Sequence, residues 1–511
     1  MHGVNHLLLS HNVIYKAMGH NIFIEDGVET ANVIEYNLVV DTRESWSLLV
    51  TDQTPASFWL QHPDNTFVGN HAAGSAKYGF HFDMPEHPTG PSADPSICPI
   101  NAKLGVFANN TAHSNGRYGL RVHHGLVPRQ YPCLPISDTN PSVEAVFENF
   151  VSYKNKRNGM ISERLGAVVF KNFTTADNGK AGMEVSLVDE EVGWGECRIK
   201  DGLVIGRTDS NSEAFLDRSS PHGIIGPRSD NFVIDGTRFV NFEKDGEAFG
   251  AALGTCSHCF HSASTDSGAR TITTMGLKFD DSVPKKISYQ FPYRAIFYDE
   301  DGSLTGIGVG TWASAYWLHN VAPECMVDQE VFDGIICDNS VQVRRVAFHG
   351  YEPSDAFRLM DLRIARWDSS LEASLTSESQ RTAYLDDIAN YSVVPFKAKK
   401  NPANGHAVPF VTGHSYRLHW DSGLDFTQLK VEISDQWQEY DRQINFVTNF
   451  TDSRGSFTVE KADCQNDCEI QSLAGDQDLQ SSGRLAGDNQ MVQDRKEFEF
   501  VVNGETEDGS R

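Results

Sequence analysis

The chain has 511 residues, enough to bury a large core, and its 43 Lys and Arg against 69 Asp and Glu give a formal net charge of −26. This charge excludes a general affinity for nucleic acid or anionic membranes, and it would also repel a polyanionic sugar unless local basic groups or a divalent cation compensate. No apolar run approaches the ~18 residues of a transmembrane helix.

A repeated pattern runs through the first part of the chain. Between Ser10 and Leu187, five stretches share a short polar turn, a glycine and then an alternating strand. The glycine position, here called the glycine slot, is occupied in chain order by Asn21, Gly79, Gly119, Gly159 and Gly182. Recurrence of one strand at a matched offset indicates a solenoid, and we predict an all-β fold built on a right-handed parallel β-helix.

The intervals between slots differ because some coils carry insertions. Gly159 and Gly182 lie 23 residues apart, which is one coil, whereas the two preceding intervals are each 40 residues long. Insertions in a solenoid map to loops on one face, often the binding face. The stretches 27–66 and 84–104 would form a cleft if they walled the outward face of the repeated strand.

Asparagine recurs at fixed distances from the slot. Four residues before it stand Asn115, Asn155 and Asn178, and ten before it stand Asn109, Asn149 and Asn172. Short amides suit tight corners, and stacked amides hydrogen-bond along a column. We therefore interpret these asparagines as structural.

The texture of the chain changes after Ser354. We predict β-helix repeats over 1–354, including weaker coils at CRIKDGLVIG, FVIDGTRFVNF and TTMGLKFDD. A small β-rich domain is expected over 355–463, with a helix around 370–388 and strands at HSYRLHW, KVEIS, INFVTNF and SFTVE. The polar stretch 464–511 is expected to be a disordered tail.

The outward positions of the repeated strand concentrate titratable side chains. Four residues past the slot stand Asp83, His123 and Glu163. Because coils stack at about 4.8 Å, we expect Asp83 and His123 to be neighbours, and likewise His123 and Glu163. Such a column can perform acid/base catalysis on a glycoside or hold a divalent cation, but it can also simply stabilise the sheet.

Other outward residues would contact a substrate. Arg121, two past its slot, can hold a uronate carboxylate. His81 holds the matching position one coil earlier, and Glu25 is the counterpart of Asp83 in the first stretch. These three are the candidate substrate-binding residues.

Two further patterns suggest metal sites. Asp299 and Asp301 precede Gly302 as in the opening of a calcium loop, although the downstream glutamate is missing. Ca²⁺ is the one cofactor that this pattern suggests. Cys256 and Cys259 have zinc-like spacing, but without a second pair a disulfide is the favoured interpretation. Motifs of serine hydrolases, HExxH metalloproteases and nucleotide-binding enzymes are absent from the sequence.

Several motifs in order carry a family resemblance, among them GHNIFIEDG, NHAAGSAKYGF, HPTGPS, AHSNGRYGL, GWGECRIKDGLVIG, DEDGSLTG and the CX11C pair Cys325/Cys337. They resemble the family of fibrocystin-L and the cell-migration-inducing hyaluronan-binding protein, from about residue 3 to 350. The resemblance implies a secreted or surface-exposed β-helix. Members carry an upstream glycine-named domain, so we expect this chain to be a fragment that lacks it and the signal peptide.

Nine cysteines suit an oxidising compartment. We expect disulfides Cys325–Cys337 and Cys98–Cys133. Sequons at Asn390 and Asn449 are the better candidates for glycosylation.

Two functions follow from this pattern. The first is an extracellular receptor-like segment, from a parent protein that could be membrane-anchored, that binds a glycan or a protein and no nucleic acid. The alternative is a glycosidase that depolymerises a uronate-containing polysaccharide through Asp83, His123 and Glu163.

Overall fold

The computed structural model describes residues 1–46, 53–189, 195–208, 222–227, 229–244, 246–255, 270–289 and 295–352, and shorter segments within 362–448 and at 495–502. The chain divides into two compact units. The β-helix unit comprises Met1–Ser262, Arg270–Ala313 and Asp328–Asp333, and the second unit includes Ser314–Val327 and Gly334–Arg511. The second unit thus begins before the predicted boundary at 354.

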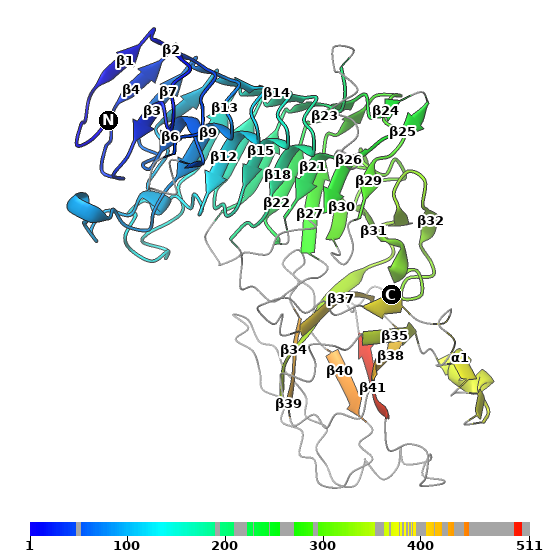
Figure 1. Cartoon of the computed structure of the whole chain (residues 1–511). Helices are drawn as coiled ribbons and strands as arrows, with labels where there is room; N and C mark the ends of the chain where they lie inside the picture. The colour runs from blue at the N-terminus through cyan, green and yellow to red at the C-terminus, as the bar shows by residue number, and fades with distance from the viewer. Residues whose placement is uncertain are drawn as a thin grey trace. The chain divides into compact units, whose positions relative to one another are not determined.

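The β-helix unit has three parallel sheets, and each regular coil contributes one strand to each (Figure 1). The first sheet contains β1 (Leu8–Ser10), β4 (Val33–Glu35), β7 (Thr66–Val68), β10 (Val106–Ala108), β13 (Ala145–Glu148), β16 (Val168–Lys171), β19 (Cys197–Lys200), β22 (Phe232–Asp235), β27 (Arg270–Met275) and β30 (Ala295–Asp299), with β31 (Thr311–Ala315) antiparallel to β30.

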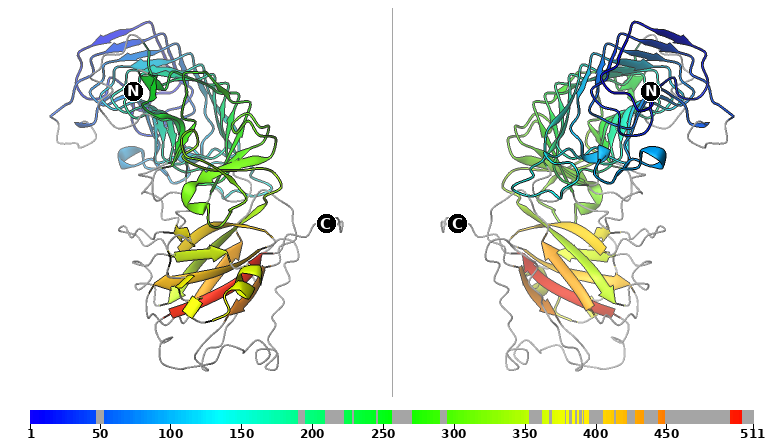
Figure 2. Two further views of the ribbon diagram at one scale, coloured as in Figure 1. Left: turned by 90° about the vertical axis from the view of Figure 1, so that its right-hand side faces the viewer. Right: turned by 90° about the vertical axis from the view of Figure 1, so that its left-hand side faces the viewer.

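The second sheet contains β2 (Val13–Tyr15), β5 (Leu38–Val40), β8 (His71–Ala73), β11 (Thr111–His113), β14 (Val151–Tyr153), β17 (Thr174–Ala176), β20 (Leu203–Ile205), β23 (Arg238–Val240) and β28 (Lys278–Phe279). The third contains β3 (Ile22–Ile24), β6 (Ala56–Leu60), β9 (Tyr78–Asp83), β12 (Tyr118–His123), β15 (Asn158–Ser162), β18 (Ala181–Val185), β21 (His222–Gly226), β26 (Ala251–Thr255) and β29 (Ile287–Ser288). The views of Figure 2 show these coils stacked on one another. The expected parallel β-helix, including its weaker coils, is confirmed.

The repeated strand of the sequence is the strand of the third sheet. Leu120 pairs with Phe80 on one side and with Met160 on the other, so the residues after the glycine slots form an inward column. A Cβ at Gly119 would lie 2.0 Å from Ser152 Oγ and 2.6 Å from the carbonyl of Gly159. This slot therefore requires glycine because the next corner approaches it closely.

The predicted insertion 27–66 is mostly a coil of the solenoid. It contains β4, β5 and β6, and its glycine slot holds Ser57. The Ser57 hydroxyl lies 2.9 Å from that of Thr42, so the polar side chain is satisfied within the corner. The described residues of this stretch therefore continue the solenoid, because its strands pair with the neighbouring coils.

Amide columns hold the corners, as predicted. The Nδ2 group of Asn115 donates to Asn155 Oδ1 at 2.8 Å, and Asn155 donates to Asn178 at 2.9 Å. Asn149 likewise donates to Asn109 on the outside of the next corner. A further buried column links Asn12, Asn37, Asn70 and Asn110. After Asn110 the same position is occupied by Phe150 and then Phe173, whose ring centres lie 5.3 Å apart.

The second unit is antiparallel. One sheet pairs β34 (Val343–Glu352) with β37 (Gly405–Val411) and β39 (Gln428–Ile433). The other has the order β36 (Ser392–Val394), β35 (Leu362–Arg366), β38 (His414–Asp421), β41 (Arg495–Val502) and β40 (Ile444–Thr448). Short elements complete the described fold: 3-10 turns η2 (Gly90–Ser92), η3 (Pro99–Asn101) and η5 (Tyr316–Leu318), strands β24 (Glu243–Lys244), β25 (Glu247–Ala248), β32 (Met326–Asp328) and β33 (Gly334–Cys337), and helix α1 (Ser369–Ser374).

The sequence predicted a helix, four strands and a disordered tail for this part of the chain. The helix predicted around 370–388 is confirmed in part by α1. The strands at HSYRLHW, KVEIS and INFVTNF are confirmed, whereas SFTVE and 464–494 lie outside the described residues. The tail prediction is wrong for 495–502, which forms β41 between β38 and β40 because RKEFEFVV alternates polar and apolar residues.

The buried amide column gives a stability prediction. Asn70 accepts the N–H of Asn37 and donates to the carbonyl of Ile34, so Asn70→Ala removes the partner of one buried N–H and one hydrogen bond to a buried carbonyl. We expect a loss of roughly 2–4 kcal/mol in the free energy of unfolding, measured by urea denaturation. The matched control is Asn149→Gly, which fits the left-handed φ of 54° on an outer corner and should cost less than about 1 kcal/mol. Equal losses in the two variants would contradict a structural role for the buried column.

Candidate functional site on the third sheet

The register of the third sheet assembles the predicted column. His123 pairs with Asp83, and Arg121 pairs with His81. Glu163 follows β15 and lies on the other side of His123, with Oε2 2.8 Å from His123 Nδ1. Asp83, His123 and Glu163 thus come from three successive coils, as the glycine-slot alignment predicts.

Arg121 links this column to an aromatic row. Its Nη2 donates to Glu163 Oε1 at 2.6 Å, and its Nη1 donates to the Tyr78 hydroxyl at 3.1 Å. Its guanidinium carbon lies 5.3 Å from the centre of the Tyr78 ring, which stacks on Tyr118. Arg121 is therefore hydrogen-bonded within the protein, and its role in binding a uronate carboxylate stays a prediction.

Imidazoles surround Asp83. The Nε2 atoms of His124, His123 and His81 lie 3.6, 3.8 and 3.9 Å from Asp83 Oδ1. His81 is 1% exposed and packs between Trp59, at 4.3 Å, and Tyr78, at 4.6 Å, between ring centres. His124 was not among the predicted site residues.

The two carboxyl groups have opposite pKa shifts. Burial raises the pKa of Glu163, but the hydrogen bonds and charges of His123 and Arg121 outweigh it and lower the pKa to about 2. Burial raises the pKa of Asp83, against the smaller opposing effect of nearby positive charge. Burial, with the charge of Arg121, holds the pKa of His81 well below its usual value. Glu163 is thus ionised and His81 neutral at physiological pH.

Glu25 does not join this cluster. Gln61, in the coil that the sequence pattern missed, donates its N–H to Ile24 and so separates Glu25 from Asp83 along the column. Glu25 is exposed and lies 3.8 Å from His2. Trp59, from the same coil, takes the place beside His81 instead.

A row of basic residues borders the site and was also missed. One basic residue stands two positions before each of four successive glycine slots, in the turns AKYG, GRYG, KRNG and GKAG: Lys77, Arg117, Arg157 and Lys180. Backbone hydrogen bonds join them in turn, from Arg117 to Lys77, Arg157 to Arg117 and Lys180 to Arg157. The four residues, here called the basic row, therefore lie on adjacent coils. Repetition of the basic residue two before the slot could have revealed it.

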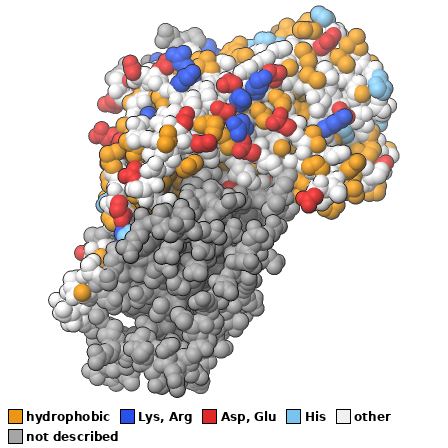
Figure 3. Space-filling view, turned by 180° about the vertical axis from the view of Figure 1, so that it is seen from behind, with side chains coloured by type: hydrophobic (Ala, Val, Ile, Leu, Met, Phe, Trp, Pro, Cys, Tyr) orange, Lys and Arg blue, Asp and Glu red, His pale blue; other side chains and the backbone are white. Residues whose placement is uncertain are grey.

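The charges of the basic row are only partly neutralised. Lys77 pairs with Glu44 at 2.8 Å, and Lys180 pairs with Glu184 at 2.6 Å. Arg157 is exposed and has no ion pair within the described part of the chain. The face drawn in Figure 3, seen from behind the view of Figure 1, intersperses basic and acidic side chains.

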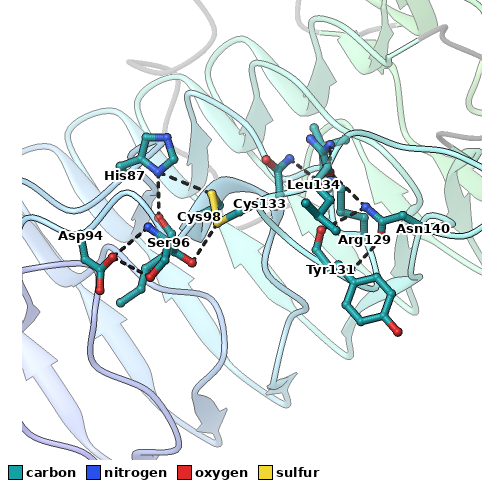
Figure 4. Close-up of a disulfide and its surroundings, with 12 residues drawn as sticks. His87, Asp94, Ser96, Cys98, Arg129, Tyr131, Cys133, Leu134 and Asn140 are labelled. Atoms are coloured by element: carbon teal, nitrogen blue, oxygen red, sulfur yellow. Dashed lines mark hydrogen bonds between the residues drawn. A yellow bond between two sulfur atoms is a disulfide. The ribbon is translucent and has the colours of Figure 1, made fainter.

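Insertions at the ends of β9 and β12 are joined to one another. The N–H of Val127 donates to Ile100, and that of Arg129 donates to Asn101. A disulfide between Cys98 and Cys133 links the same two insertions (Figure 4). The stretch 84–104, which follows Asp83, and the insertion that follows His123 are thus braced against each other.

The remaining predicted sites have other roles. Asp299 accepts hydrogen bonds from the N–H and hydroxyl of Thr305, and Asp301 accepts the N–H groups of Gly276 and Ser303. Both carboxylates hold turns, and the calcium site expected there stays a prediction. The disulfide Cys325–Cys337 is present. Cys256 and Cys259 lie outside the described residues.

Comparisons with known proteins agree with this architecture. A family model described as CEMIP beta-helix matches residues 1–120. Fibrocystin-L of Mus musculus is 32% identical over 420 residues, which covers 78% of this chain, and Fibrocystin-L of Homo sapiens is 30% identical over 422 residues. The chain belongs to the fibrocystin-L and CEMIP family of β-helix proteins. It spans 9% of the length of these two relatives.

A second branch of the family matches the β-helix more locally. Cell surface hyaluronidase CEMIP2 of Homo sapiens is 32% identical over 228 residues, covering 35% of this chain and 16% of that protein. In the part of the present chain that the structure describes, no helix is long and apolar enough to cross a membrane.

The depressed pKa of Glu163 predicts a pH-dependent contribution to stability. Because the folded pKa of about 2 lies below the ordinary value of about 4.3, Glu163 stabilises the fold above pH ~4.3 and loses this effect as the pH falls through ~2. We expect Glu163→Gln to cost up to about 3 kcal/mol at neutral pH and progressively less below pH ~4, measured by urea denaturation.

The control is Glu148→Gln on the first sheet. Glu148 pairs with Lys171 at 2.9 Å but is 38% exposed, so its loss should cost less than about 1 kcal/mol. A pH-independent difference between wild type and Glu163→Gln would show that Glu163 is not held by His123 and Arg121.

Proposed function

We propose that the third sheet of the β-helix unit binds an acidic, uronate-containing glycan in an extracellular or cell-surface setting. The observation that carries this proposal is the basic row, a line of four cations on adjacent coils in a chain of net charge −26. Cations repeated at the coil spacing of about 4.8 Å suit a linear polyanion better than a single charged group.

Aromatic rings and local charge support a sugar as the ligand. The rings of Tyr78 and Tyr118 stack with their centres 5.8 Å apart. Arg117 of the basic row lies 3.4 Å from the Tyr78 hydroxyl. Arginine forks bind carboxylates in two parallel hydrogen bonds. The name of the human relative CEMIP2 associates that protein with hyaluronan, a glycan of this class. The disulfides and the cell-surface name of that relative support the extracellular setting.

The binding test uses the whole chain and hyaluronan oligosaccharides of defined length, with a neutral glucan of equal length as the comparison ligand. Arg117→Gln and Arg157→Gln should each weaken hyaluronan binding about threefold to fivefold, and the double variant more, because each removes one cation of the basic row. Affinity should also fall as salt rises.

Lys171→Gln is the matched control, since Lys171 lies on the first sheet and is paired with Glu148. It should leave the affinity unchanged. Equal binding of hyaluronan and the neutral glucan, or equal losses in Lys171→Gln and Arg157→Gln, would overturn the proposal.

A second candidate function is cleavage of the bound glycan. It is favoured by one observation: His123 lies between an ionised Glu163 and an Asp83 whose pKa is raised, and carboxyl groups with diverging pKa values suit base and acid roles. In this reading Asp83 would protonate the leaving oxygen, and the pair of His123 and Glu163 would accept a proton from water.

Chain-length analysis of hyaluronan, with and without calcium, tests this candidate. Shortening by the wild-type chain that is abolished in both Asp83→Asn and His123→Ala would support catalysis by this column. Unchanged hyaluronan under both conditions would contradict it while leaving the binding proposal intact.

A further inference from the structure

The centre of the histidine cluster has polar atoms that no hydrogen bond satisfies. Asp83 Oδ1 is buried and, among the described residues, has no hydrogen-bond partner, and the same holds for both ring nitrogens of His81. Three imidazole Nε2 atoms nevertheless converge on this oxygen at 3.6 to 3.9 Å. Buried polar groups of this kind are costly unless a further species lies between them.

We propose that Asp83, His123 and His124 bind one divalent metal ion of the zinc class, with His81 as a further donor on the buried side. The donor atoms of the first three lie within 4.8 Å of one another. Metal bonds of about 2.0–2.2 Å in a tetrahedral site separate neighbouring donors by about 3.3–3.5 Å. The observed separations of 3.6 and 3.8 Å to Asp83 need only small movements to meet this geometry.

The surroundings of His123 match those of a metal ligand. Its Nδ1 faces Glu163 at 2.8 Å, which leaves the lone pair of Nε2 directed to Asp83. Metal-binding histidines commonly donate their other ring N–H to a carboxylate, which fixes the tautomer. Arg121 Nη2 also lies 2.9 Å from Nδ1, but it donates to Glu163 Oε1, so Glu163 can accept from both Arg121 and a proton on Nδ1.

Backbone geometry brings His124 to the same side as His123. Successive residues of a strand point to opposite faces, yet the two rings lie 3.9 Å apart. His124 has a left-handed φ of 60°, which ends β12 and turns its side chain back beside the strand. The His124 side chain is 59% exposed, so an ion can reach the cluster from solvent.

The donor chemistry favours zinc or a similar transition metal over calcium. Imidazole nitrogen suits zinc, copper, nickel and iron, whereas calcium takes oxygen ligands. Two other clusters of possible metal ligands among the described residues are weaker candidates. In one, Cys98 and Cys133 form a disulfide, and in the other, Glu29 accepts the backbone N–H groups of Gly3 and Asp26.

This inference does not depend on glycan binding, so its test uses the metal alone. The full chain is stripped with a chelator, dialysed against Zn²⁺, and its metal content is measured by mass spectrometry. Wild type should retain about one Zn²⁺ per chain more than His124→Gln or Asp83→Asn. Zinc held elsewhere, for example by cysteines, remains in all variants and cancels in this comparison.

Two further variants sharpen the result. His113→Ala, on the second sheet with a histidine neighbour of its own in His71 at 5.0 Å, should retain as much zinc as wild type. Glu163→Gln should lower Zn²⁺ affinity roughly 10–100-fold without removing a ligand, as loss of an orienting carboxylate does. His124 is exposed, so His124→Gln should fold normally, which circular dichroism checks. Equal zinc content in wild type and His124→Gln, or equal loss in His113→Ala, would overturn the proposal.

Discussion

The structure depends on the unshifted parallel register between coils. Each strand of a regular coil pairs with the same position of the coil before and after it, and the corners continue the pattern through backbone and amide hydrogen bonds. Because side chains alternate along a strand, a slip of one residue would exchange the inward and outward faces. The register therefore fixes two things at once: the apolar column through Phe80 and Leu120, and the outward column through Asp83 and His123.

Once the register is fixed, the chemistry of the outer face follows from stacking. Residues at equal distance from successive glycine slots become neighbours, whatever the length of the insertions between them. This is how His123 meets Glu163, with Nδ1 2.8 Å from Oε2, although the two residues come from different coils. The insertions then brace this face through the Cys98–Cys133 disulfide and do not disturb the pairing of the strands.

Much of this was predictable from sequence, for physical reasons. The position of Gly119 requires glycine because a side chain there would collide with the next corner, so the glycine marks this position in the sequence. The alternation of polar and apolar residues after it predicts which side chains face inward and which face outward. The coil through Ser57 was missed because a hydrogen-bonded serine occupies the slot without the steric need for glycine. Because this coil was missed, Glu25 was expected next to Asp83, and Trp59 was not predicted as a neighbour of His81. His124 was not predicted as a site residue because strand alternation assigns it to the inner face. Its left-handed φ cannot be read from the sequence.

The site depends on successive coils placing Arg121 beside Glu163. A double-mutant cycle with Arg121→Gln, Glu163→Gln and the double variant, measured by urea denaturation, tests this contact most directly. We expect a coupling energy of about 1–3 kcal/mol, since both groups are mostly buried and in direct contact. Additive effects, with coupling below about 0.5 kcal/mol, would contradict the register and the site built on it.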